Sequence, residues 1–143
     1  MIRVTHLLIC ICFILVSMSA AIADDVRNDN NFVSVDAAHV SATKAGGTAQ
    51  LEFKITNQGN EPVNLKSVRS HLAQNSRVTI FDPYQGRQVI KELSVLRDET
   101  LDLASSHIRV ELINLSKDIE PGSTIEFELV FRRFSTIAEA HVR

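Results

Sequence analysis

The sequence predicts an all-β protein, a single antiparallel β-sandwich or barrel. Apolar and polar residues alternate with a period of two in several segments, and turn-forming residues separate these segments at intervals of about 8–12 residues. No window shows the period of about 3.6 residues that marks an amphipathic helix. The length of 143 residues suits one domain. We expect that domain at 32–143, after a polar, flexible lead at 24–31.

Alternation is clearest at residues 51–55, 107–112 and 124–131. Apolar side chains occupy every second position there, as in a strand with one buried and one solvated face. Weaker strands are expected at 32–40, 62–69, 76–81, 87–96 and 136–142. Turns rich in Gly, Pro, Asn and Asp lie at 57–60, 82–86 and 120–123. Short strands joined by such turns favour an antiparallel sandwich or barrel.

The first 23 residues have the layout of a secretory signal peptide. Arg3 supplies a positive charge, residues 7–16 form an apolar stretch, and Ala21 and Ala23 form a small-residue cleavage site. The apolar stretch is too short to span a bilayer, which takes roughly 20 residues. We therefore expect export to the periplasm, cleavage after Ala23 and no transmembrane anchor in the cleaved chain.

Cleavage would remove both cysteines, Cys10 and Cys12, and both methionines, Met1 and Met18. Neither cysteine follows a small residue at the end of the apolar stretch, so we expect no lipid anchor on them. The cleaved chain would have no disulfide and no soft sulfur ligand for Cu(I). The net charge of the whole chain is −2, which argues against a nucleic-acid binder.

The order of three stretches is distinctive. They are AHVSAT at 38–43 with LEFKITNQGNEPVNL at 51–65, RVTIFD at 77–82, and LINLSKDIEPGSTIEFELVF at 112–131. Together they resemble the PCuAC family of periplasmic copper chaperones, most specifically in the run T-N-x-G-x-x-P at 56–62. The resemblance implies a cupredoxin-like Greek-key sandwich. It also implies delivery of copper toward the Cu(A) centre of cytochrome oxidase, with an envelope or membrane-bound protein as partner.

The copper ligands of that family do not recur at the matching positions. In the family a His ends one strand, one or two Met follow it, and a His-x-Met pair lies on a later strand. The matching positions here are Phe81, residues 88–93 without a Met, Arg109 and Glu111. The resemblance therefore implies a divergent member that lacks the His and Met ligands.

His107, Glu111 and His71 are the candidate metal ligands. Alternation places His107, Arg109 and Glu111 on one strand face, and His71 precedes the strand of Phe81, so that it could approach the same rim. Imidazole and carboxylate favour Cu(II) or Zn(II) over Cu(I). Two alternatives stay open, both without a metal. Arg109 and Glu111 form an ordinary surface ion pair beside a solvated His107, or that pair fills the former metal position.

Two further histidines lie outside this ligand set. His39 is expected to be a half-buried packing residue. His141 lies near the last residue, where chains are commonly mobile, and could join a site as a terminal imidazole.

No enzyme class is indicated. The sequence has no Gly-x-Ser-x-Gly, no His-Glu-x-x-His and, after cleavage, no Cys nucleophile. The leading interpretation is an exported copper-chaperone-like protein that handles copper and delivers it toward oxidase assembly. The alternative is an adaptor or assembly module that has the fold, binds no metal and docks on an envelope protein.

Overall fold

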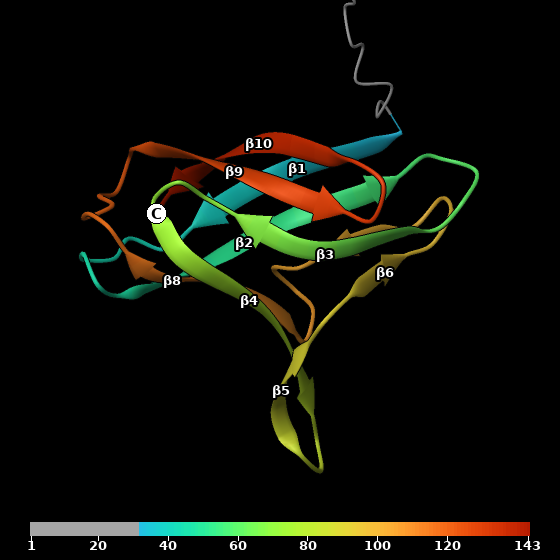
Figure 1. Ribbon diagram of the computed structural model, residues 1–143, viewed down its shortest axis with the longest axis horizontal. Coiled ribbons are helices and arrows are strands. Elements are labelled where there is room, and N and C mark those ends of the chain that lie inside the picture. Colours follow the sequence, from blue (N-terminus) through green and yellow to red (C-terminus); the bar gives the residue numbers. More distant parts are fainter. Residues whose placement is uncertain (1–31) are drawn as a thin grey trace, which may run out of the picture.

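Ten strands and no helix make up residues 32–143, the part of the chain that the computed structural model describes (Figure 1). The strands are β1 (Val33–Val40), β2 (Thr48–Asn57), β3 (Val63–Arg69), β4 (Ala73–Asp82), β5 (Gly86–Ile90), β6 (Leu93–Val95), β7 (Thr100–Asp102), β8 (Ile108–Leu115), β9 (Thr124–Phe131) and β10 (Ser135–Val142). The predicted signal peptide at 1–23 and the lead at 24–31 lie outside the described residues. Within the described part, no helical segment could cross a bilayer.

The strands form one continuous sheet that folds over to enclose a core. Its order is β5-β4-β8-β2-β1-β10-β9-β3-β6, and β7 pairs with β2. The all-β prediction is confirmed, but the sheet is mixed because β1 and β10 run parallel. Turn motifs predict antiparallel pairing only between strands that follow one another. β1 and β10 come from opposite ends of the domain, so no turn indicated their direction.

Strand alternation produces the core. Leu51, Phe53 and Ile55 of β2 are at most 1% exposed, whereas Lys54 between them faces solvent. Phe53 meets Phe127 of β9 with the ring centroids 5.5 Å apart, so that strands distant in the sheet order pack against each other. Full burial of one such side chain contributes about 1.5–3 kcal/mol. The period-two pattern therefore supplies the main stabilising term.

The single strand predicted at 87–96 is wrong in its extent. The segment forms two strands, β5 and β6, which are interrupted at Lys91 and Glu92. β5 pairs with β4 in a hairpin that projects from the barrel, whereas β6 pairs with β3 (Figure 1). The chain breaks because one straight strand cannot pair at both places. β7 was not predicted, since three residues are too few to show alternation.

Asn57 ends β2 and organises the turn that follows. Its side chain is fully buried. The Nδ2 group donates to the carbonyl of Glu61 at 2.8 Å and to the carbonyls of Val95 and Leu96 at 3.2 and 3.1 Å. The Oδ1 atom accepts the N–H of Gly59 at 2.9 Å. One amide thus joins the end of β2 to the next turn and to the end of β6.

Gly59 is needed in the same turn because of a close approach. A Cβ at this position would lie 2.9 Å from Cδ2 of Phe32 and 3.1 Å from Oδ1 of Asn57. A larger residue would displace the ring or the amide. The T-N-x-G run is therefore a packing motif, in which the amide binds backbone groups and the glycine leaves room for Phe32.

We predict that Asn57→Ala lowers the free energy of unfolding by about 2–3 kcal/mol, because it empties a fully buried position and the backbone groups bonded to the amide, among them the buried carbonyl of Val95, lose their partner. Denaturant unfolding followed by far-UV circular dichroism measures the loss. Gln58→Ala is the matched control, since Gln58 is exposed and its backbone, not its side chain, bonds Phe32. The control should change the free energy by less than about 0.5 kcal/mol. Equal losses for the two variants would contradict the role of the Asn57 amide.

Candidate functional site

Phe81 occupies the position that the PCuAC resemblance matches to the first copper ligand. The pairing of β4 with β8 ends at Ile80, and Phe81 follows it and pairs with β5 of the projecting hairpin. Its backbone N–H donates to the carbonyl of His107 at 3.1 Å, and on β5 it faces Arg87. We call Thr79, Phe81, Arg87, His107 and Arg109 the hairpin base. The structure brings His107 and Phe81 together there.

Cationic side chains dominate the hairpin base. Arg87 donates through Nη1 to Oγ1 of Thr79 at 3.2 Å, and Thr79 is only 2% exposed. Arg109 stands opposite Thr79 on β8. His107 precedes Arg109 by two residues on the same face of the chain, so the cluster holds two guanidinium groups and one imidazole. Positive charges in the same cluster oppose the binding of a metal cation there.

Glu111 is paired with Arg77 of β4. The two residues face each other across the β4–β8 ladder and form an ion pair, in which the Glu111 side chain is 17% exposed and that of Arg77 48%. The predicted Arg109–Glu111 pair is therefore wrong. Residues directly opposite on neighbouring strands lie closer together than residues two apart on one strand, so the cross-strand register decides the partner.

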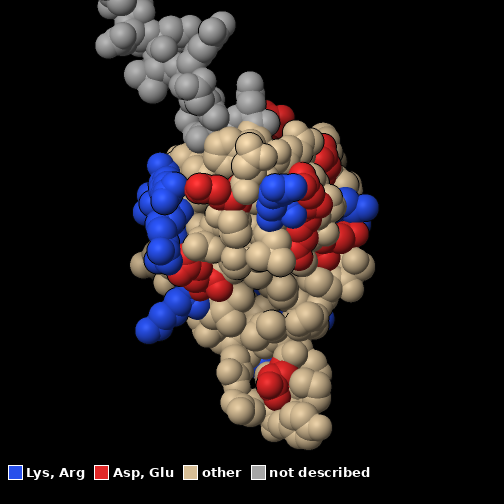
Figure 2. Space-filling view, turned by 90° about the vertical axis from the view of Figure 1, so that its right-hand side faces the viewer, with Lys and Arg blue, Asp and Glu red and all other residues tan. Residues whose placement is uncertain are grey.

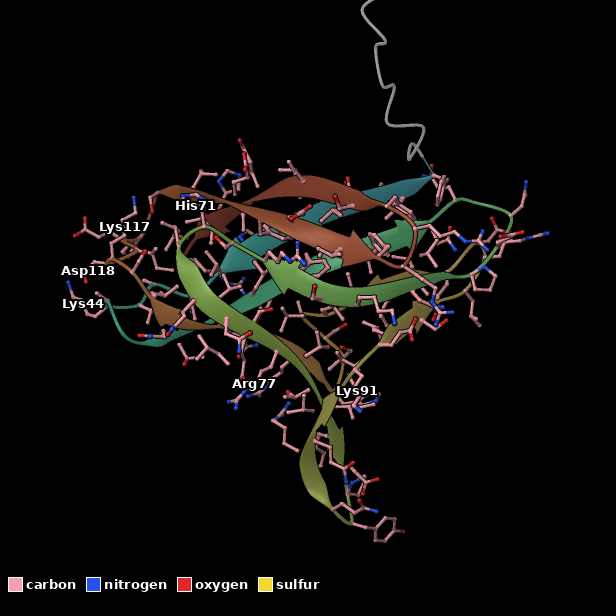
Figure 3. All side chains as sticks on the ribbon, in the orientation of Figure 1. Lys44, His71, Arg77, Lys91, Lys117 and Asp118 are labelled. Carbon is pink, nitrogen blue, oxygen red and sulfur yellow. The ribbon has the colours of Figure 1, made fainter. Side chains whose placement is uncertain are left out.

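His71 does not approach His107. It is exposed in the connection between β3 and β4, next to Leu72, whose carbonyl accepts the N–H of Ser116 beyond the far end of β8 (Figure 3). His107 lies beside Phe81, at the opposite end of β4. Ten strand residues separate the two ends, roughly 30 Å at the usual rise. The expectation that both histidines share one rim is wrong, because β4 is a single long strand and places them at its two ends.

The donor set of residues 32–143 does not fit a Cu(I) site. No group of three or more His, Cys, Asp or Glu side chains within this range could together hold a metal ion. The same range has no Cys and no Met, the soft donors that Cu(I) prefers. The hairpin base thus offers one imidazole, His107, next to two cations.

The structure brings together two histidines that the sequence did not connect. His39 of β1 and His141 of β10 occupy facing register positions, with ring centroids 6.4 Å apart. His39 is half-buried, as expected, and His141 is exposed. Only the parallel pairing of β1 with β10 makes them neighbours. The only sequence feature that could have indicated this pair is the presence of one histidine in each terminal strand.

The family follows from a match that spans nearly the whole described domain. A model of LpqE-like proteins, described as lipoproteins, matches residues 33–142. The chain belongs to the LpqE-like family. No curated protein matches this LpqE-like chain.

Solved structures share the fold of this LpqE-like protein. The copper-bound PCuAC domain from PmoF2 has a TM-score of 0.68 and 21% identity, covering 78% of this chain and 92% of that one. The apo PCuAC domain from PmoF1 has a TM-score of 0.67 and 19% identity, covering 78% and 93%. The Cu(I) form of DR1885 from Deinococcus radiodurans has a TM-score of 0.63 and 19% identity, covering 76% of each chain. The PCuAC resemblance and the cupredoxin-like fold are confirmed.

We predict that Glu111→Gln changes the free energy of unfolding by no more than about 1 kcal/mol, because Arg77 is half exposed and such pairs contribute little. It should leave metal binding unchanged, since Glu111 is held by Arg77. Denaturant unfolding and metal titration of the same sample measure both quantities, with Arg77→Gln as the control for the ion pair. Loss of metal binding in Glu111→Gln alone would show that this carboxylate is a ligand.

Proposed function

We propose that this LpqE-like protein is an exported, copper-chaperone-like carrier. The observation that supports this function best is the fold, which extends over 78% of the chain in common with a domain solved with copper bound. DR1885, solved with Cu(I), has the same fold. The function comes to this chain by similarity of fold and by the T-N-x-G-x-x-P run at 56–62.

The copper would be carried as Cu(II). Residues 32–143 offer imidazole and carboxylate donors but no thiolate or thioether. These nitrogen and oxygen donors favour Cu(II) over Cu(I), and Cu(II) over Zn(II). The protein that receives the copper would then have to bind it more tightly or supply a reductant.

We place the carrier in the periplasm, after cleavage at Ala23, delivering copper toward cytochrome oxidase assembly at the membrane. The signal-peptide pattern supports export, and the PCuAC resemblance supports the oxidase as destination. The description of the family as lipoproteins also supports a place in the cell envelope. It makes lipid attachment at Cys10 or Cys12 the alternative to simple cleavage. A lipidated chain would begin at a cysteine, whereas the cleaved chain would begin at Asp24.

We predict that the processed protein, purified after export, binds one Cu(II) per chain and takes no Cu(I) from a competing chelator. The physical reason is the absence of sulfur donors from residues 32–143. Equilibrium titration with Cu(II), Zn(II) and Cu(I) measures the preference, and the mass of the same sample reports where the chain was processed.

The outcomes of this titration separate the parts of the proposal. Tight Cu(I) binding would contradict the assigned oxidation state but would still support a copper-carrier function. Failure to bind copper in either state would overturn the carrier function. A mass that includes a lipid would replace cleavage at Ala23 by lipid attachment.

One observation favours a second candidate, an adaptor that docks on an envelope protein without carrying metal. The β4–β5 hairpin projects as a mostly uncharged arm (Figure 2). Its apolar side chains are open to solvent, with Tyr84 97%, Val89 65% and Phe81 49% exposed. Oδ1 of Asp82 accepts the N–H of Tyr84 at 2.7 Å and fixes the tip. Grouped, exposed apolar side chains of this kind mark interaction sites.

For this candidate we predict that Tyr84→Ser with Val89→Ser abolishes complementation in a strain that lacks the protein, measured as cytochrome oxidase activity. The stability of the double variant should change by less than about 0.5 kcal/mol, because both side chains are exposed. Leu96→Ser, at a residue 57% exposed outside the hairpin, is the control. Full complementation by the double variant would exclude docking through the hairpin.

A further inference from the structure

The outer face of β1 and β10 carries two imidazoles side by side. His39 and His141 face each other in the parallel ladder, with ring centroids 6.4 Å apart and ring planes inclined by 45°. His39 is half-buried and so held by its surroundings, whereas His141 is exposed and contacts Thr124 of β9 through Nδ1. Metal–imidazole bonds measure about 2.0–2.1 Å, so a small rotation of His141 would let both rings bind one ion.

The hydrogen bonding of the two rings leaves a nitrogen available to a ligand on each histidine. Nδ1 of His39 is buried and has no hydrogen-bond partner among residues 32–143. Buried polar atoms nearly always have a partner, so an unpaired one calls for an explanation such as an ion. Nδ1 of His141 lies 3.3 Å from Oγ1 of Thr124. In the tautomer whose Nδ1 donates to Thr124, that hydrogen bond orients the ring and leaves Nε2 free to bind a metal, the usual arrangement of ligating histidines.

Carboxylates surround the two imidazoles. Glu52 stands opposite His39 on β2, Glu139 lies two residues before His141 on the same face of β10, and Glu126 of β9 stands opposite Glu139. Arg143 neutralises Glu52, but no ion pair involves Glu126 or Glu139 within residues 32–143. Like charges directly opposite each other destabilise a sheet. A bound cation nearby would relieve that repulsion.

A groove of about 690 Å³ gives access to the pair. Residues of β1 and β10 line it, among them Asp36, His39, Glu139 and His141. Its charged lining is therefore acidic, in contrast to the hairpin base, where Arg87 and Arg109 lie in one cluster with His107. The charges therefore attract a divalent cation to the groove of β1 and β10 and repel it from the hairpin base.

We propose that His39 and His141 form a two-imidazole site for Cu(II), with water or a ligand of the receiving protein completing the coordination. The proposal deepens the carrier function and rests on it for the identity of the metal. Imidazole suits Cu(II), Ni(II) and Zn(II), and Cu(II) binds most tightly in this series. Glu139 and Glu126 strengthen the site by charge without coordinating. Two protein ligands leave positions open, as transfer to a partner requires.

The test is a Cu(II) titration of the processed protein and of His39→Gln, His141→Ala and His107→Ala, with electron paramagnetic resonance to count coupled nitrogens. His107→Ala is the matched control, an exposed histidine at the other candidate position. Loss of an outer-shell partner alone weakens metal binding about 10–100-fold, so we expect His141→Ala to weaken Cu(II) binding by at least about 100-fold. Its spectrum should lose one of two nitrogens. The His107→Ala protein should match the wild type.

Each outcome is decisive. His141 is exposed, so His141→Ala tests the site even if His39→Gln fails to fold. Cu(II) binding that survives in His141→Ala and disappears in His107→Ala would overturn the two-imidazole site and leave the carrier function standing. Binding unaffected by every variant would also overturn the site. A wild-type protein that binds no Cu(II) would overturn both.

Glu139→Gln tests the electrostatic part of the argument. It should weaken Cu(II) binding by several-fold at low ionic strength, and the difference from wild type should shrink as salt is added, because screening acts on solvent-exposed charges. The nitrogen count should stay at two. A Glu139→Gln protein with wild-type affinity at every salt concentration would overturn the contribution of the carboxylates.

Discussion

The buried amide of Asn57 is the interaction on which closure of the barrel depends. β2 and β6 lie far apart in the order of the sheet, yet this one side chain hydrogen-bonds to the carbonyls of Val95 and Leu96 where β6 ends. It also bonds its own turn through Glu61 and Gly59. An apolar residue of the same size would leave these backbone groups without this hydrogen-bond partner, the buried carbonyl of Val95 among them. The most specific part of the family motif is therefore the part that holds the sheet closed.

Charge distinguishes the hairpin base, which holds His107, from the face of β1 and β10, which holds His39 and His141. At the hairpin base, Arg87 covers Thr79 and Arg109 stands beside it, so His107 lies in a cationic setting. On the outer face of β1 and β10, carboxylates without ion-pair partners in the described chain stand near His39 and His141. The same fold can thus present a metal donor in opposite electrostatic environments. Which histidine meets a cation is decided by its neighbours as much as by its own chemistry.

The spacing of apolar and turn-forming residues predicted the features that depend on neighbouring residues in the chain, namely strands and turns. Alternation at 51–55 and 124–131 identified the strands that bury Phe53 and Phe127, and the turn at 120–123 marked the start of β9. The turn of the final β9–β10 hairpin, between Phe131 and Ser135, was not predicted. Contacts between distant segments were not predictable in this way. Arg77 is the partner of Glu111 because of the β4–β8 register, and His39 meets His141 because the terminal strands are parallel. Neither register is encoded in the spacing of residues within one strand.

The parallel pairing of β1 and β10 has a consequence for how the chain matures. Contacts between the two ends of a domain require the largest loop to close, and topologies rich in such contacts fold slowly. β1 is synthesised first and β10 last, so the ladder that contains His39 and His141 forms only after the whole domain has been made. A truncated or stalled chain would carry His39 without its neighbour. The two rings are therefore adjacent only once both terminal strands are present and paired.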